Sequence, residues 1–126
     1  MTTRPLIAVV DDDQVYSEMI RDFLSGEGYD TLVLREAASA VAAIVRASPA
    51  LVLLDVRMDV ADSGVSILTD LRSRSETASL PVIVCTADQH FLRSQAAFLQ
   101  SQNAASVAKP FDLDVLLDVI SRTIGE

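Results

Sequence analysis

Acidic residues stand directly after two apolar stretches of the chain. Asp11 and Asp12 follow residues 6–10, and Asp55 follows residues 51–54. A charged carboxylate is costly to bury without a partner, so each should lie where a buried strand ends and the sheet opens to water. Three acids brought close together repel one another unless a cation lies between them. Such oxygen ligands suit Mg²⁺, which keeps several waters and binds one or two carboxylates.

A hydroxyl and an ammonium end two later apolar stretches. Thr86 follows residues 82–85, and Lys109, the only lysine among ten basic residues, follows residues 104–108. A hydroxyl and a compact ammonium suit the oxygens of a phosphoryl group. Asp55 is then available as the nucleophile, because a metal held by Asp12 can neutralise an incoming phosphate. The plainer alternatives are a helix-capping turn at residues 11–13, a strand-end threonine and a surface lysine.

The elements that position these residues alternate between strand and helix. Apolar stretches predict five strands, and helical spacing of apolar residues predicts five helices with short connections between them. Such alternation indicates a parallel sheet covered by helices on both faces, with all strand carboxyl ends at one edge. The predicted strands are 6–10, 31–34, 51–54, 82–85 and 104–108, and the predicted helices lie between Asp13 and Gly28, at 37–47, 64–74 and 89–101, and from Asp112 onward.

Composition limits the class of protein. The 126 residues carry a net charge of −8 and are 50% hydrophobic, which predicts a single domain over 1–126 with its own core. The acidic balance argues against nucleic-acid binding by this domain. No stretch approaches the roughly 20 apolar residues of a membrane span, and no signal peptide is evident at the start. Cys85, the only cysteine, should pack as a small hydrophobe, which fits a cytoplasmic protein.

Four short motifs, in this order and at these distances, cover essentially the whole chain. They are Val9-Val10-Asp11-Asp12-Asp13, Leu53-Leu54-Asp55-Val56-Arg57-Met58, Val84-Cys85-Thr86-Ala87 and Val107-Ala108-Lys109-Pro110-Phe111. Together they resemble the response-regulator receiver domain of two-component signalling, of the chemotaxis-regulator type. The resemblance implies a flavodoxin-like, doubly wound α/β fold with strand order 2-1-3-4-5 and five helices.

The resemblance also implies a phosphoacceptor site. Asp55 would accept a phosphoryl group from a histidine kinase or a histidine phosphotransfer protein. Mg²⁺ or Mn²⁺ would be bound by Asp12 and Asp55, by the backbone carbonyl of Arg57, and by Asp11 through water. The chain would then be a signalling phosphoacceptor and not an enzyme, although it takes part in its own phosphorylation and dephosphorylation.

Further roles follow from the same resemblance. Thr86, the Ala87 backbone amide and Lys109 would hold the phosphoryl oxygens. Thr86 would also act as a switch toward the face formed by the fourth helix, fifth strand and fifth helix. Arg57 and Asp88, on the rim of the site, would tune hydrolysis of the phosphoryl group. The Lys109–Pro110 bond is usually cis in the family.

Three positions depart from the family pattern. Asp59 stands where a proline usually follows the methionine of the second motif. The loop glycine usually lies eight residues after the acceptor, where this chain has Ser63, and Gly64 comes one residue later. Ser106 occupies the position, three before the lysine, that usually carries Tyr or Phe. The loop after Asp55 and the usual aromatic relay should therefore differ here.

Two other functions remain open from the sequence. The stretch around Asp11 and Asp13 also resembles the first motif of haloacid dehalogenase-type phosphatases, with Asp11 as nucleophile and Asp13 as acid. That family needs a later acidic pair at another strand end, and the acids after Lys109 fall in the predicted last helix. The second alternative is a degenerate receiver that acts only as a binding module. The domain could stand alone or belong to a longer protein.

Overall fold

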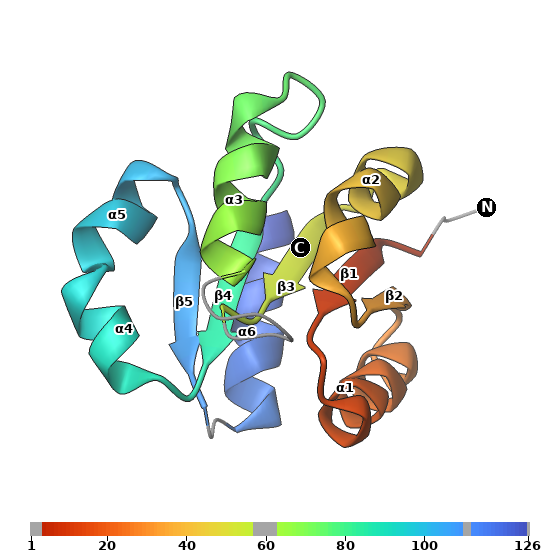
Figure 1. Ribbon diagram of the computed structural model, residues 1–126. Helices are drawn as coiled ribbons and strands as arrows, with labels where there is room; N and C mark the ends of the chain where they lie inside the picture. The colour runs from red at the N-terminus through yellow and green to blue at the C-terminus, as the bar shows by residue number, and fades with distance from the viewer. Residues whose placement is uncertain (1–3, 57–62, 110–111, 126) are drawn as a thin grey trace.

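A five-stranded parallel sheet forms the centre of the computed structural model (Figure 1), which describes residues 4–56, 63–109 and 112–125. The strands lie in the order β2-β1-β3-β4-β5, so the predicted topology is confirmed. Strand bounds agree with the sequence-based ranges to within one residue. They are β1 (Leu6–Val10), β2 (Asp30–Leu34), β3 (Leu51–Leu54), β4 (Val82–Thr86) and β5 (Ala105–Ala108).

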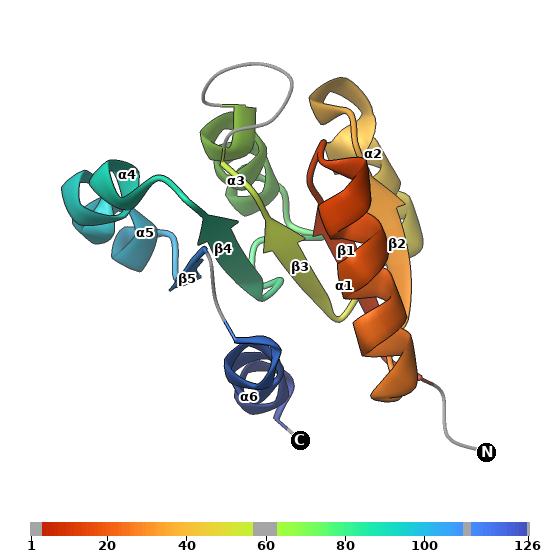
Figure 2. The ribbon, with the colours of Figure 1, turned by 90° about the horizontal axis from the view of Figure 1, so that it is seen from below.

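Helices cover both faces of this sheet. Figure 2 shows α2 and α3 on one side and α6 on the other. Among the described helices, none is long and apolar enough to cross a membrane. The bounds are α1 (Gln14–Gly26), α2 (Ala37–Ala47), α3 (Ser63–Ser73), α4 (Gln89–Ser94), α5 (Ala96–Ser101) and α6 (Leu113–Ile124).

Alternate residues of each strand feed two separate hydrophobic cores. In β1, Ile7 and Val9 pack with α1 and α6, whereas Ala8 and Val10 pack with α2 and α3. Side chains of a strand point alternately to its two faces, so a strand covered on both sides must be apolar at every position. All four residues of β3 are buried for this reason. Each fully buried aliphatic side chain contributes about 1.5–3 kcal/mol by leaving water.

The prediction of one continuous helix over 89–101 is wrong. This segment forms two helices, so the described residues contain six helices and not the expected five. The helix breaks at Gln95, where φ is −110° and ψ is 16°, into α4 and α5. Phe91 and Leu99 both pack on the α2–α3 side of the sheet. On one straight helix, residues eight apart would point about 80° away from each other. The break lets both side chains reach the same core.

Helix ends follow the capping expected from the sequence. The Asp13 carboxylate accepts a hydrogen bond from the Tyr16 amide at 3.0 Å and caps α1. Beyond the other end of α1, Gly28 has a φ of +96°, a conformation that L side chains rarely adopt. Asp112 caps α6 through the Asp114 amide at 2.9 Å. An apolar residue just before a helix cap often packs against one in the next turn, which predicts a contact between Phe111 and Leu116. Phe111 lies outside the described residues.

Candidate functional site

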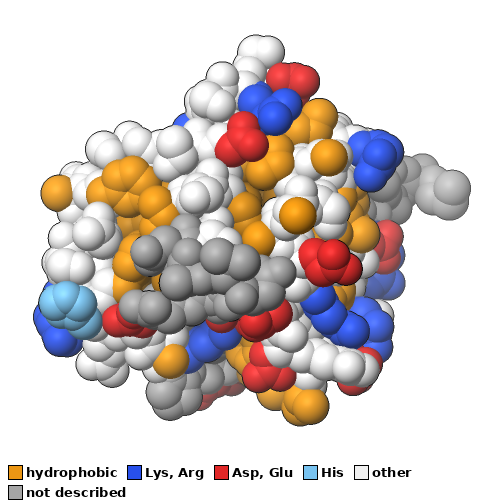
Figure 3. All heavy atoms as spheres, viewed as in Figure 1, with side chains coloured by type: hydrophobic (Ala, Val, Ile, Leu, Met, Phe, Trp, Pro, Cys, Tyr) orange, Lys and Arg blue, Asp and Glu red, His pale blue; other side chains and the backbone are white. Residues whose placement is uncertain are grey.

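The register of the sheet places Asp11 beside Asp55. Val10, the last residue of β1, pairs with Leu54, the last residue of β3. The Asp55 amide then donates a hydrogen bond to the Val10 carbonyl at 3.0 Å. Because these strands are neighbours and run parallel, the residues after them leave the sheet together. Figure 3 shows acidic and basic side chains close together at this end of the molecule, below the centre of the view.

Lys109, which follows the edge strand β5, contacts both of these acids. Its Nζ atom lies 2.8 Å from Oδ2 of Asp11 and 3.3 Å from Oδ2 of Asp55. Its backbone amide donates to the Thr86 carbonyl at 2.8 Å, which fixes the start of the side chain beside the end of β4. We refer to Asp11, Asp55 and Lys109 as the acid–lysine cluster.

The acid–lysine cluster is largely shielded from water. The side chains of Lys109, Asp11 and Asp55 are 17%, 4% and 13% exposed. Burial by itself lowers the pKa of the lysine, but the hydrogen bond and charge of Asp11, together with Asp55, outweigh it and raise that pKa above its usual value. The lysine therefore stays charged and neutralises part of the acidic site.

The acids after β1 are placed differently from one another. Asp11 is buried, and its Oδ1 atom accepts a hydrogen bond from the Asp13 amide at 3.0 Å. Asp12, the next residue along the chain, is exposed. The Oδ1 atom of Asp13 accepts the hydrogen bond that caps α1. This arrangement gives Asp13 a structural role in place of the acid role that a phosphatase would require.

Thr86 and Asp88 form a short hydrogen-bonded turn at the end of β4. Thr86 is buried, and its Oγ1 atom accepts a hydrogen bond from the Asp88 amide at 3.1 Å. Asp88 in turn caps α4, because its Oδ1 atom accepts from the Phe91 amide at 2.9 Å. Ala87, between them, is exposed. The capping role of Asp88 was missed from the sequence, although an aspartate three residues before the first apolar residue of a helix indicates it.

Gly64 lies against the backbone of the acceptor loop. A Cβ atom on Gly64 would come within 2.3 Å of the Val56 Cα atom and 2.5 Å of the Asp55 carbonyl oxygen. Real Cβ atoms essentially never approach backbone so closely, so only glycine fits here. Gly64 is therefore in close contact with the acceptor segment, although it lies one residue later than in the family pattern. Arg57 and Asp59 lie outside the described residues.

Ser63, next to this glycine, starts α3. Its side chain is buried, and its Oγ atom has no hydrogen-bond partner among the residues that the structure describes.

An aromatic side chain completes the cluster, and it was not singled out from the sequence as a site residue. The Nζ atom of Lys109 lies over the ring of Tyr16, 3.8 Å from the ring centre. Tyr16 is in the first turn of α1, directly after the acidic segment. In the sequence, Tyr16 falls at helical spacing with Ile20 and Phe23, which indicates only a core position. The ring contact depends on the reach of a lysine at the end of a distant strand, which spacing along the chain does not reveal.

The donor chemistry of the site fits a hard divalent cation. Among the described residues, no group of three or more His, Cys, Asp or Glu side chains could hold a metal ion by itself. Mg²⁺ does not need such a group, since it usually keeps several waters and takes one or two carboxylates. Asp12 and Asp55 supply carboxylate oxygens at the open end of the sheet, and the Arg57 carbonyl lies outside the described residues. The residues present are therefore compatible with Mg²⁺.

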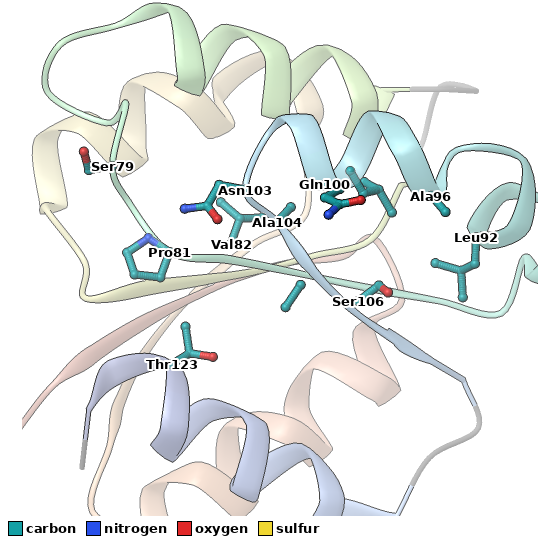
Figure 4. Close-up of a pocket in the computed structure, with 12 residues that line it drawn as sticks. Ser79, Pro81, Val82, Leu92, Ala96, Gln100, Asn103, Ala104, Ser106 and Thr123 are labelled. Atoms are coloured by element: carbon teal, nitrogen blue, oxygen red, sulfur yellow. The ribbon is translucent and has the colours of Figure 1, made fainter.

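Ser106 lies apart from the acid–lysine cluster, on the outer strand of the sheet. It is exposed and lines an open groove of about 520 Å³, which we call the β5 groove (Figure 4). The groove runs between α5, β5 and the end of α6, where Thr123 lies. Small side chains such as Ala96 and Ala105 line it, so the missing aromatic at position 106 leaves this face hollow.

The parallel sheet, its order and the acids at its carboxyl edge define a receiver domain. A sequence model of the response regulator receiver domain family matches residues 7–121. The chain belongs to this family, whose members act in two-component signalling, and the phosphatase alternative is thereby set aside.

Relatives and solved structures agree with this assignment. The chain is 37% identical over 86 residues to the DNA-binding response regulator MtrA of Mycolicibacterium smegmatis, covering 68% of this chain and 36% of that protein. It is 35% identical over 108 residues to the probable transcriptional regulatory protein TcrX of Mycobacterium tuberculosis, covering 86% of this chain and 44% of that protein. The chain thus spans less than half of the length of these curated relatives.

Among solved structures, the receiver domain of the sensor histidine kinase PA1611 from Pseudomonas aeruginosa matches with a TM-score of 0.84 and 28% identity, covering 98% of this chain and all of that one. That structure has a magnesium ion coordinated in its active-site cleft. The chemotaxis protein CheY4 of Vibrio cholerae matches with a TM-score of 0.83 and 22% identity over 96% of this chain and 99% of that one, which shows the shared fold.

Proposed function

We propose that Asp55 accepts a phosphoryl group from the phosphohistidine of a histidine kinase or a histidine phosphotransfer protein. The observation that carries the proposal is the acid–lysine cluster. The largely shielded Lys109 ammonium lies 2.8 Å and 3.3 Å from two carboxylates at the carboxyl edge of the sheet. Positive charge held ready at this place suits the oxygens of an incoming phosphoryl group.

The transfer is a substitution at phosphorus. An Oδ atom of Asp55 attacks the phosphorus and forms the new oxygen–phosphorus bond. The nitrogen–phosphorus bond to the donor imidazole breaks, and its electron pair stays on the nitrogen, which takes up a proton. Lys109 turns from the carboxylates to a phosphoryl oxygen, and the Thr86 hydroxyl and the Ala87 amide donate to the others. Ala87, which is exposed between Asp88 and the buried Thr86, supports this placement of the amide.

Mg²⁺, or Mn²⁺ in its place, belongs to the same proposal. Asp12, Asp55 and the Arg57 carbonyl would hold the ion directly, and Asp11 would hold it through water. When bound, the ion supplies positive charge that offsets the charge of the phosphoryl oxygens. The burial of Asp11 and its hydrogen bond from Lys109 support the indirect role.

The wider assignment follows from the family and the charge. We propose one receiver domain over 1–126 that works in the cytoplasm as a signalling phosphoacceptor and not as an enzyme with an outside substrate. Its net charge of −8 favours protein partners over nucleic acid or membrane for this domain. Arg57 and Asp88 would tune the lifetime of the phosphoryl group from the rim of the site. Of these two residues, Arg57 lies outside the described part of the chain.

The signalling face in this proposal consists of α4, α5, β5 and α6, which correspond to the fourth helix, fifth strand and fifth helix of the family pattern. Thr86 connects the site to this face, because it ends β4 beside β5 and lies just before α4. Phosphorylation would shift a pre-existing equilibrium there. The β5 groove beside Ser106 supports a change that is built without the usual aromatic side chain.

The test is phosphorylation with acetyl phosphate and Mg²⁺ followed by intact-mass and peptide-mass measurement. The expected result is one phosphoryl adduct on Asp55 in the parent and none in Asp55→Asn, with the far-ultraviolet circular dichroism unchanged. Asp22→Asn, an exposed acid on α1, is the matched control and should be phosphorylated like the parent. A parent that takes up no phosphoryl group would favour the second candidate, a receiver that acts only as a binding module.

A further inference from the structure

We propose that Tyr16 is a positioning residue whose ring holds the Lys109 ammonium between Asp11 and Asp55 for phosphoryl transfer. The inference rests on the function proposed above and adds a residue to its machinery. The ring centre lies 3.8 Å from Nζ, well inside the distance of about 6 Å at which an ammonium is attracted to an aromatic face.

The ammonium has contacts of two kinds. Asp11 and Asp55 bind it through carboxylate oxygens, and Tyr16 meets it with the face of a ring. The face of an aromatic ring carries partial negative charge, so it favours a cation without offering an atom that could capture it. The lysine can therefore leave the carboxylates for a phosphoryl oxygen while remaining over the ring. A third carboxylate at this place would hold the lysine back.

Tyr16 also closes the inner side of the site. Tyr16, Cys85, Asp11 and Asp55 are among the residues that line a hollow of about 10 Å³ beneath the cluster. This volume is about the least that holds one water molecule. Burial, followed by the nearby Cys85 and acids, raises the pKa of the Tyr16 phenol well above its usual value, so the ring stays neutral. A neutral ring adds no negative charge that would compete with the carboxylates for the ammonium.

The single lysine gives the inference a direct measurement. Protein labelled with ¹³C-lysine shows one lysine side chain, that of Lys109. A ring 3.8 Å away should shift the methylene protons next to Nζ upfield of their position in the unfolded chain. This measurement needs no variant and no phosphoryl donor. An unshifted signal in the folded parent would overturn the proposal.

Three variants then separate positioning from packing. Tyr16→Phe keeps the ring and should keep both the lysine shift and the rate of phosphorylation by acetyl phosphate with Mg²⁺. Tyr16→Leu loses the ring and should lose the shift, with phosphorylation about threefold to tenfold slower. Phe23→Leu makes the same change further along α1, against the same side of the core, and should match the parent in both measurements.

The outcomes distinguish this inference from the proposed function. If the parent takes up no phosphoryl group, the proposed function fails, and the positioning role fails with it. If the parent is phosphorylated and Tyr16→Leu reacts at the same rate, the inference alone is overturned. A Tyr16→Phe variant as slow as Tyr16→Leu would also overturn it, because the hydroxyl and not the ring would then matter.

Discussion

The Nζ atom of Lys109 and the Oδ2 atom of Asp11 lie 2.8 Å apart, although 98 residues separate them in the chain. This contact joins the last strand of the chain to the first across the carboxyl edge of the sheet. Because Asp11 is almost fully buried, the pair also carries part of the stability of the fold.

Lys109→Met should destabilise the protein in the absence of divalent cations. The change leaves the buried Asp11 carboxylate without its cation, which costs about 3 kcal/mol when one partner of a buried pair is removed. If a divalent cation binds as proposed, millimolar Mg²⁺ should restore part of the loss. Urea unfolding with and without Mg²⁺ measures both effects. A loss equal to that of Arg74→Met, which removes an exposed pair with Asp70, would contradict the role of Lys109.

Asp12→Ala should weaken Mg²⁺ binding by about tenfold or more, because even indirect metal contacts are worth that much. It should also raise the stability of the metal-free protein, since the exposed Asp12 lies beside like charges. Isothermal titration calorimetry with Mg²⁺ gives the affinity. Asp22→Ala, which changes an exposed acid on α1, serves as the control and should bind Mg²⁺ like the parent. Equal Mg²⁺ affinities for all three proteins would show that Asp12 does not bind the metal.

Gly64→Ala should lower the free energy of unfolding by about 3 kcal/mol, because the new methyl group would meet backbone atoms that cannot move cheaply. It should also slow phosphorylation, since those atoms belong to Asp55 and Val56. Gly26→Ala is the matched control. Apart from the adjacent residues and the backbone of α1 itself, no described atom lies within 4 Å of a Cβ at Gly26, and the change should be neutral or stabilising by about 0.5 kcal/mol. Similar unfolding curves for both variants would show that the acceptor segment has room for a side chain.

The Cys85 thiol should make stability depend on pH only above pH 9. Burial, with smaller contributions from Asp55 and Asp11 against that of Lys109, raises the pKa of this thiol from 9.0 to about 12. A raised pKa gives stability that is complete below the unfolded value and is lost as the pH rises toward the folded one. The expected fall is up to about 1.4 kcal/mol per pH unit. Cys85→Ala should show a shallower decline between pH 9 and pH 12, and parallel curves would contradict this.

Much of the fold follows from simple patterns in the sequence. Uninterrupted apolar runs such as residues 51–54 are found as strands covered on both faces, and Asp13, Gly28 and Asp112 end their helices as expected. The break at Gln95 was not predicted, because Phe91 and Leu99 fit one helix locally. Only their shared contact with the sheet requires two segments.

The candidate site was predicted unevenly for a similar reason. Residues at strand ends, such as Asp55 and Lys109, are brought together by topology alone, so alternating elements were enough to place them. Tyr16 lies on a helix, and its contact with Lys109 depends on side-chain reach. The second role of Asp88 as the cap of α4 depends on where that helix begins.

The shielding of the only lysine has a practical consequence for labelling and capture. Reagents that acylate amines have two kinds of target in this chain, the α-amino group at its start and the Lys109 side chain, which is 17% exposed and ion-paired. Under mild conditions they should therefore attach at the start of the chain and leave the site intact. The rate at which Lys109 is acylated then reports how often the site opens, and mass spectrometry of a single peptide measures that rate.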